Sequence, residues 1–398
     1  MMLTAIGIFF VFLLLGMPVA FAIGLSGFSF FMFADLPMTI LVQKSISASQ
    51  SFTMLAIPLF VLAGNLMNSC GITKRLMRFC NACTGHMRGN IGQVSCLLST
   101  LMGGVSGSAV ADAAMQCRIL GPEMNRLGYA KGWSAAINGL SGLIVATIPP
   151  SMGLIIYGTV GEVSIGRLFM AGWVPGILMC VLLMLAVSWS AKKFGYKPEF
   201  EKPAPFSEIW KSFISSIWAI MFPVLLILLI RFGITSPTES GAFACAYALF
   251  VGIVVHKELT KEALMQTLRD SVKDITVITI ILAFSGVFGY GVVYDGITIT
   301  IASALTSITS NPTILLGIVI LFLLICGCFM ETTVTFGVMT PPVGTALYTC
   351  SDIMGCSIQE TVKYGWPFYL AIVGVILFMV FFPDAVLFLP NLVYGAGG

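Results

Sequence analysis

Long apolar segments follow one another along almost the whole chain. A helix that crosses a bilayer needs about 20 mostly apolar residues. In lipid the backbone must satisfy its own hydrogen bonds, which a helix does within one segment. No alternating pattern of a membrane barrel is visible in the sequence. The pattern predicts an all-α polytopic membrane protein with apolar segments at Leu3–Phe33, Ser51–Met67, Leu168–Ala191, Ser212–Ile230, Gly241–Val255, Asp274–Val293, Pro312–Met330 and Pro367–Phe388.

Composition supports this prediction. The 398 residues are 58% hydrophobic and 9% charged, whereas soluble domains carry roughly a quarter charged residues. The first apolar segment lacks a basic start and is too long for a cleaved signal peptide. The net charge of +3 does not point to nucleic acid, and no such partner is expected. Cys80 and Cys83 have metal-like spacing without a second pair, so we expect packing cysteines rather than a transition-metal site.

A polar stretch divides the chain near its middle. Residues 192–211 read KKFGYKPEFEKPAPFSEIWK, with three prolines and five lysines. This composition predicts a linker between residues 1–191 and 212–398, and its lysines favour the cytoplasmic side. If each half holds an odd number of spans, both termini lie outside. The charged segment His256–Lys273 is expected to form an amphipathic surface helix between two spans.

The two halves resemble each other weakly. Four features recur in the same order, which are Pro18 with Pro237, Ser108 with Thr332, Pro149 with Pro341, and Trp173 with Trp366. With an odd number of spans in each half, these would be inverted repeats. Inverted repeats are typical of transporters and place the binding site near the midplane, where the repeats meet.

The second half is shorter at one place. Ser108 and Pro149 are 41 residues apart, whereas Thr332 and Pro341 are 9 residues apart. About one helix and a turn are therefore missing from the second half, since a span takes about 20 residues. The gap reflects either a true deletion or a defect of the sequence.

Residues 103–112, GGVSGSAVAD, interrupt an apolar segment with glycine and serine. Such a break is tolerated in a membrane only where protein or a water-filled cavity covers it. We predict a re-entrant helical hairpin near residues 94–122. Its tip at Ser106, Gly107 and Ser108 would offer oxygen ligands to Na⁺ and the positive end of a half-helix to an anion. The alternative is a small-residue face for helix packing.

Asp112 lies in otherwise apolar sequence. An ionisable side chain at membrane depth is costly and indicates a functional site, here for the substrate. The alternative is a carboxylate that caps the second arm of the hairpin.

Consecutive prolines predict a second break. Neither Pro149 nor Pro150 can donate a helical hydrogen bond, so a helix must end there. The freed carbonyls, with Ser151 and Asn138, would complete a cation site opposite the hairpin tip. The alternative is a plain loop between two spans, which is weakened because residues 340–344, TPPVG, repeat the device.

The sequence Met330-Glu331-Thr332-Thr333 occupies the position of the first hairpin tip in the second half. The two threonine hydroxyls would act as the serines do, and Glu331 has the same functional interpretation as Asp112. The alternative is the simple end of a span.

Several motifs together resemble one family. LAIPLFVLAG, GVSGSAVAD, IPPS, AGWVPG, SPTESGA, FMETT and TPPVG occur in order over nearly the whole chain. They are similar to the large membrane subunit of tripartite ATP-independent periplasmic (TRAP) transporters. The resemblance implies scaffold and transport domains, two re-entrant hairpins, an elevator motion and Na⁺-driven uptake of organic acids. It also implies the bacterial inner membrane, a small four-helix membrane subunit and a periplasmic substrate-binding protein.

By this resemblance the first tip, Ser106–Ser108, faces Pro149–Ser151, and the second tip, Glu331–Thr333, faces Thr340–Gly344. The chain departs from the family at the second hairpin, expected near residues 312–339. Only residues 334–339 join its tip to the following break, and six residues extend at most about 20 Å. They cannot form the second arm, which puts the second ion site in doubt.

We therefore expect a secondary transporter subunit and not an enzyme, with Na⁺ as coupling ion and no cofactor. Alternatives are a transport-defective or assembly-only subunit, or an intramembrane enzyme that uses Asp112 or Glu331. The sequence does not indicate which acid is carried. The expected Na⁺ ligands come from Ser106, Gly107, Ser108, Asn138, Pro149, Ser151, Thr332, Thr333, Thr340, Pro341 and Gly344. The expected substrate contacts come from Ser108, Asp112, Pro150, Glu331 and Pro342.

Overall fold

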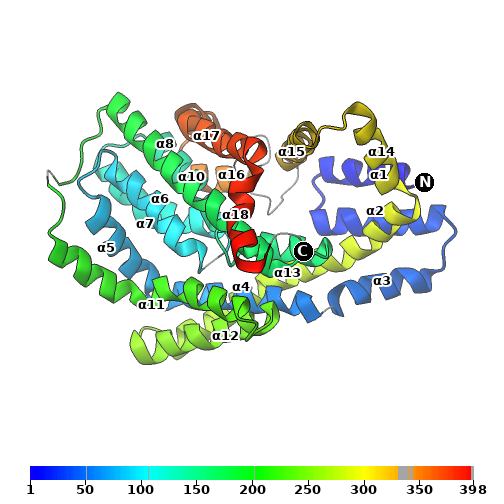
Figure 1. Cartoon of the computed structure of the whole chain (residues 1–398), viewed down its shortest axis with the longest axis horizontal. Coiled ribbons are helices and arrows are strands. Elements are labelled where there is room, and N and C mark those ends of the chain that lie inside the picture. The colour runs from blue at the N-terminus through cyan, green and yellow to red at the C-terminus, as the bar shows by residue number, and fades with distance from the viewer. Residues whose placement is uncertain (51, 106, 201, 330–338, 340–343, 396–398) are drawn as a thin grey trace.

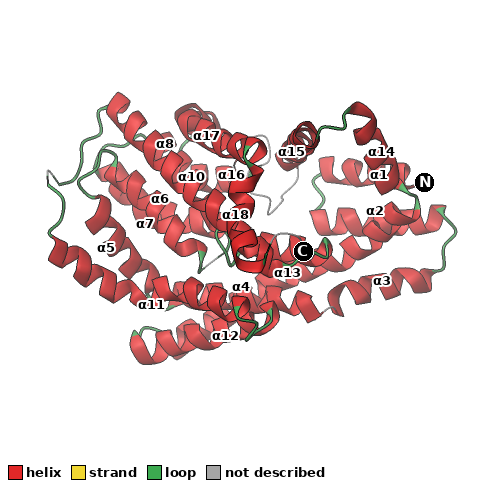
Figure 2. Cartoon of the chain, in the orientation of Figure 1, coloured by secondary structure: helices red, strands yellow, loops and turns green. Residues whose placement is uncertain are grey.

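The computed structural model describes the chain except for residues 51, 106, 201, 330–338, 340–343 and 396–398. Within the described ranges all regular secondary structure is helical (Figure 2). Among the described residues, five helices are long and apolar enough to cross a membrane, or up to seven if each of two bent pairs forms one span. The predicted all-α polytopic membrane fold is confirmed.

The helices follow one another with short connections (Figure 1). In chain order they are α1 Met2–Leu14, α2 Val19–Phe33, α3 Met38–Gln50, the 3-10 turn η1 Phe52–Leu55, α4 Ala56–Ser69, α5 Ile72–Thr84, α6 Asn90–Gly103, α7 Ala109–Arg126, α8 Lys131–Thr147, α9 Met152–Val160, α10 Ile165–Phe194, α11 Phe206–Arg231, α12 Pro237–Phe250, the π-helical turn η2 Val251–Val255, α13 Lys261–Tyr294, α14 Ile297–Ile308, α15 Pro312–Phe329, α16 Thr345–Met354, α17 Ile358–Phe381 and α18 Pro383–Tyr394.

Helix α8 lies at the centre of the larger group of helices. It packs against α6, α7, α10, α16 and α17 (Figure 1). Small residues let backbones approach closely in a membrane protein, and Ala135, Ala136, Gly139 and Gly142 of α8 are all buried. A Cβ atom on Gly142 would lie 2.7 Å from the carbonyl oxygen of Ala109 in α7. The small side chains of α8 therefore set how close the neighbouring helices can come.

A smaller group contains α1, α2, α3 and α13, at the right of Figure 1. Its core is formed by the buried side chains Met2, Ala5, Phe30, Phe31 and Val287. Helix α13 also packs against α4, so it connects this group to the rest of the molecule.

Two expected apolar segments are each split into two helices. Leu3–Phe33 is interrupted between α1 and α2, where Gly16 has a φ of +82° and Pro18 precedes the new helix. Pro367–Phe388 is interrupted at Phe382, directly before Pro383. In both places a proline, which lacks a backbone donor, lies at the start of the new helix: Pro18 directly before α2 and Pro383 as the first residue of α18. Hydrophobic length alone therefore overestimated the length of these spans.

The expected separate surface helix at His256–Lys273 was wrong. Helix α13 begins at Lys261, where the Thr260 hydroxyl caps it by accepting from the Ala263 amide at 3.2 Å, and it continues without a break to Tyr294. The first glycine of this helix is Gly286, and it contains no proline. Without a helix breaker, the charged turns and the apolar turns form one continuous rod.

Candidate ion and substrate site

The first predicted break is present between α6 and α7. Helix α6 ends at Gly103, and Gly107 has a φ of +62°, a conformation that glycine adopts without steric cost. Ser108 is extended, and its hydroxyl caps α7 by accepting from the Ala111 amide at 3.4 Å. Ser106 lies outside the described residues. The glycines end one helix and the serine starts the next, as expected of a hairpin tip.

Side-chain hydrogen bonds join the two arms of this hairpin. The Ser99 hydroxyl of α6 donates to Oδ2 of Asp112 in α7 at 2.9 Å. One helical turn further from the tip on each arm, Ser95 donates to Oε1 of Gln116 at 2.5 Å. Contacts that step away from the tip on both arms together show that the arms run antiparallel.

The second predicted break lies between α8 and α9. These helices are bent by 45° relative to each other. Ile148 is extended after the end of α8, and Ser151 is extended before α9. The Ser151 hydroxyl donates to the carbonyl oxygen of Ala146 at 2.5 Å. Because the prolines between them have no amide hydrogen, the last carbonyls of α8 lose their usual partners.

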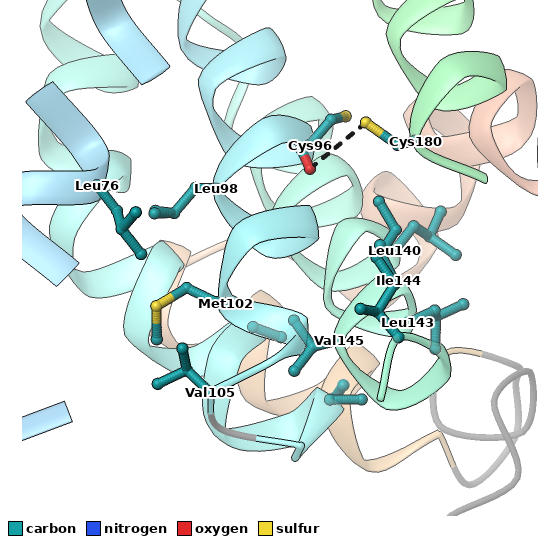
Figure 3. Close-up of a cluster of buried hydrophobic side chains, with 14 of the residues drawn as sticks. Leu76, Cys96, Leu98, Met102, Val105, Leu140, Leu143, Ile144, Val145 and Cys180 are labelled. Carbon is teal, nitrogen blue, oxygen red and sulfur yellow. Dashed lines mark hydrogen bonds between the residues drawn. The ribbon is translucent and has the colours of Figure 1, made fainter. Parts of the chain in front are cut away.

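The hairpin tip touches this second break. A Cβ atom on Gly107 would lie 3.1 Å from the carbonyl oxygen of Pro150 and 3.6 Å from the amide nitrogen of Met152. Figure 3 shows the neighbouring apolar cluster, in which Met102 of α6, Val105 just after it and Val145 of α8 are all buried. Two chain interruptions that are about 40 residues apart in sequence therefore form one junction.

The junction brings opposite helix ends together. Helices α7 and α9 begin there, at Ala109 and Met152, and α6 and α8 end there, at Gly103 and Thr147. Helix beginnings carry partial positive charge from free amides, and helix ends carry partial negative charge from free carbonyls. The same place thus offers oxygen atoms to a cation and amide groups to a carboxylate.

Asp112 is enclosed between the hairpin arms. Its side chain is 2% exposed, and its Oδ2 also accepts from Nε2 of Gln116 at 2.6 Å. Its Oδ1 has no hydrogen-bond partner among the described residues. In this conformation the carboxyl group holds the arms together and is not open to a ligand. The sequence prediction placed it at the substrate.

Asn138 is not part of the junction. It lies ten residues before Ile148 on the continuous helix α8, which corresponds to about 15 Å along the helix axis. It is fully buried, and its Nδ2 points to the sulfur of Met124 at 3.6 Å. The sequence grouped it with the prolines because the length of the helix before the break was not known.

Most of the predicted second site lies outside the described residues. This applies to Glu331, Thr332, Thr333, Thr340, Pro341 and Pro342. Gly344 is described and directly precedes α16, which packs against α7 and α8. Met339 is buried, and its carbonyl oxygen accepts from the Tyr369 hydroxyl at 2.7 Å. Met339 therefore contacts α17, and the chain that follows this segment contacts α7 and α8 of the first junction through α16.

The sequence analysis missed four polar residues in and beside the hairpin, namely Ser95, Ser99 and Gln116 of its arms and Ser141 of α8. Ser95 and Ser141 hydroxyls are 2.8 Å apart, and Gln116 donates to Ser99 at 2.6 Å. All four side chains are fully buried. The sequence did contain a signal for these contacts. Ser95 and Ser99 are four residues apart on one arm, and Asp112 and Gln116 are four residues apart on the other, so each pair lies on one face of its helix.

Comparison with known proteins identifies the family of this arrangement. The family described as "Tripartite ATP-independent periplasmic transporter, DctM component" matches residues 6–338 and 333–385. The chain belongs to this family. It is a large permease subunit of a TRAP transporter and a multi-pass protein of the inner membrane. The two matched stretches meet at residues 333–338, in the short connection of the second half.

Curated relatives cover nearly the whole TRAP subunit. The 2,3-diketo-L-gulonate TRAP transporter large permease protein of Escherichia coli (strain K12) is 33% identical, over 94% of this chain and 95% of the relative. The sialic acid TRAP transporter large permease protein of Vibrio cholerae is 32% identical, over 96% of each chain. The C4-dicarboxylate TRAP transporter large permease protein of Rhodobacter capsulatus is 29% identical, over 98% and 99%.

The alignment with the Escherichia coli relative spans 405 positions but only 94% of the 398 residues, or about 374 residues. About 31 aligned positions of that relative (405 less 374) therefore have no counterpart in this chain. This is close to the length of the segment that the internal comparison of the two halves found missing.

Proposed function

We propose that this TRAP subunit takes up an organic acid and that Na⁺ binding at the α6–α7 and α8–α9 junction drives the uptake. The observation that carries the proposal is the contact between the two chain interruptions, with the Gly107 Cβ position 3.1 Å from the Pro150 carbonyl oxygen. Na⁺ prefers oxygen ligands, as other hard cations do. Ser106, Gly107, Ser108, Pro149 and Ser151 supply these oxygens in the proposal.

The substrate class follows from helix ends and from the relatives. The beginnings of α7 and α9 direct amide groups to the junction, which suits a carboxylate. The three relatives are named for diketogulonate, sialic acid and a C4-dicarboxylate, and each of these carries a carboxylate. We propose that the free amides of α7 and α9, rather than a buried arginine, hold the acid.

Coupling requires that Na⁺ and the acid together favour the conformation that moves. A ligand shifts a conformational equilibrium only by its difference in affinity for the two states. In the proposal, ion and acid bind between the hairpin tip and the broken helix and complete a unit that moves as one body. The four-helix small subunit and a periplasmic binding protein are the proposed partners, and the binding protein delivers the acid.

The short connection after Thr333 supports a second candidate. Residues 334–339 are too few for a second hairpin arm, and the family match divides at this place. A chain that lacks the arm would lack the second Na⁺ site and one wall of the substrate cavity. It would then assemble with its partners without transporting.

Reconstitution into proteoliposomes with both partner subunits separates the two candidates. Uptake of labelled 2,3-diketo-L-gulonate, sialic acid or succinate is measured with an inward Na⁺ gradient and with equal Na⁺ on both sides. We expect uptake of one of these acids only with the gradient. Uptake that ignores Na⁺ contradicts the proposed mechanism. Stable assembly without any uptake supports the assembly-only candidate.

A further inference from the structure

An open cavity of about 390 Å³ lies between the end of α5, the linker and the start of α11. Polar and charged side chains line it, namely Arg78, Asn81, His86, Lys202, Glu208 and Ser212. None of these residues belongs to the junction described above. The cavity therefore needs its own explanation.

Hydrogen bonds hold the linker wall of this cavity in place. The amide of Phe200 donates to the carbonyl oxygen of Gly85 at 3.2 Å. Nδ2 of Asn90 donates to Oε2 of Glu199 at 3.0 Å. On the opposite wall α5 packs against α11, where the rings of Phe79 and Phe213 lie 5.7 Å apart. These contacts fix both walls, so the cavity is a defined part of the fold.

The charged groups of the cavity favour an anion. Arg78 and Lys202 form no ion pair within the part of the chain that the structure describes. Nδ1 of His86 is buried and has no hydrogen-bond partner in that part. Glu208 is the one carboxylate among the described lining residues. Two cations and several hydrogen-bonding groups thus face the cavity against one negative charge.

The position of the cavity relative to the membrane selects the kind of anion. The lysines of the linker favour the cytoplasmic side. The stacked rings of Phe206, Trp210 and Phe213 begin α11, and Trp210 is 53% exposed. Exposed tryptophans are typical of the headgroup level of a bilayer. Basic pockets at this level of the cytoplasmic leaflet suit the phosphate groups of anionic lipids.

We propose that this cavity binds the phosphate headgroup of an anionic phospholipid from the cytoplasmic leaflet. Arg78 and Lys202 pair with the phosphate, and Asn81 and Ser212 donate hydrogen bonds to it. The ring of Phe200 and the neighbouring prolines meet the glycerol end of the lipid. The bound lipid fixes the linker that joins the two halves of the subunit. This binding is independent of Na⁺ coupling at the junction.

Lipid titration in nanodiscs tests the proposal. The purified full chain is placed in phosphatidylcholine, phosphatidylglycerol is added, and bound lipid is counted by native mass spectrometry. Arg78→Gln and Lys202→Gln are each expected to weaken binding about fivefold, because one cation near the surface contributes roughly this factor. The matched control is Lys211→Gln, which removes an exposed lysine beside Ser212 that does not line the cavity, and it should change binding less than about twofold.

Three results would overturn the proposal. Equal weakening by Lys211→Gln would show a diffuse surface effect. Equal retention of phosphatidylcholine would show that the headgroup charge is not recognised. Displacement of the lipid by millimolar inorganic phosphate would show a site for free anions. Lys202→Gln lies in the linker outside any helix, so the test remains available if Arg78→Gln disturbs folding.

Discussion

Two helix pairs of this TRAP subunit are bent at short breaks, and they differ in what happens to the freed carbonyl groups. Helices α4 and α5 are bent by 67°, and helices α8 and α9 by 45°. At the first bend, Nη1 of Arg75 donates to the Gly71 carbonyl at 3.0 Å, and Nδ1 of His256 contacts the Cys70 carbonyl at 2.8 Å. Side chains therefore occupy the carbonyl groups that this bend frees, and we call such a bend closed.

At the α8–α9 break the neighbours are different. The Ser151 hydroxyl reaches back to Ala146, and the hairpin tip supplies Gly107 near the Pro150 carbonyl. No cationic side chain of the described residues donates to this break. The comparison teaches that a bend by itself does not indicate an ion site. A bend becomes a candidate when no charged side chain of the described residues closes it.

The largest effect is expected inside the hairpin. Side-chain hydrogen bonds join its two arms, and in this respect it resembles the closed α4–α5 bend. Asp112→Ala leaves the Ser99 and Gln116 donors without an acceptor in a buried place, which costs about 3 kcal/mol of stability. Asp112→Asn keeps an acceptor oxygen there and should cost less than about 1 kcal/mol. Thermal unfolding in detergent measures both. Equal loss in the two variants would show that the carboxylate charge, and not the hydrogen bonds, matters.

The contact at the open break is tested by Gly107→Ala. The new Cβ lies 3.1 Å from the Pro150 carbonyl oxygen at a φ of +62°, and we expect Na⁺-driven uptake to fall about tenfold or more. Gly128→Ala is the matched control, because Gly128 has a φ of +79° and no atom within 4 Å of its Cβ position. The control shares the backbone strain and should retain its Na⁺ dependence. A similar loss of uptake in both variants would show that backbone strain, and not the contact with Pro150, causes the loss.

Ser108→Ala separates a helix cap from an ion ligand. Ser108 and Ser164 both begin a helix and accept from an amide three residues later at 3.4 Å. Each alanine variant should lose about 1 kcal/mol of stability. Only Ser108→Ala should raise the Na⁺ concentration for half-maximal uptake, by about fivefold. An unchanged Na⁺ requirement would assign Ser108 a capping role alone.

Opening the closed bend should affect stability without affecting Na⁺. Arg75→Gln removes the donor to the Gly71 carbonyl. It also removes the ion pair with Glu258, in which Nη2 of Arg75 lies 2.8 Å from Oε1 of Glu258. We expect a loss of about 1 kcal/mol, because the pair is partly exposed to solvent. Thermal unfolding measures the loss, and uptake assays should show the wild-type Na⁺ dependence. A changed Na⁺ dependence would mean that this bend also participates in transport.

The smallest effect concerns pH at the same bend. Burial has the largest effect on the pKa of His256 and lowers it. The contact with the Cys70 carbonyl raises this pKa, and the nearby charge of Arg75 lowers it. A lowered histidine pKa stabilises the fold above the unfolded pKa of about 6.5, and this contribution is lost as the pH falls. The free energy of unfolding of the wild type should therefore fall more between pH 7.5 and pH 5.5 than that of His256→Gln, by less than about 1 kcal/mol, and unfolding in detergent at the two pH values measures the difference. Parallel pH profiles would contradict this role.

The breaks were predictable from the sequence, but their contacts were not. Gly103, Gly104 and the consecutive prolines at 149 and 150 predicted interrupted helices, and the structure has both. Asn138 was misplaced because its distance from the break depends on how far α8 continues. The buried bonds of Ser95 and Gln116 were missed because they depend on how the two arms align. Apolar length also gave no sign that α13 is continuous from Lys261.

The sequence by itself determined that lipid must surround most of the chain and that helices end near Gly103 and Pro149. Both are local properties, since burial of apolar side chains and the loss of a backbone donor at proline act within a few residues. Only the tertiary structure decided which freed carbonyls stay open. His256 closes the α4–α5 bend from 186 residues away, and Gly107 approaches Pro150 from another helix pair. Such partners are set by packing between distant segments, which no local pattern contains.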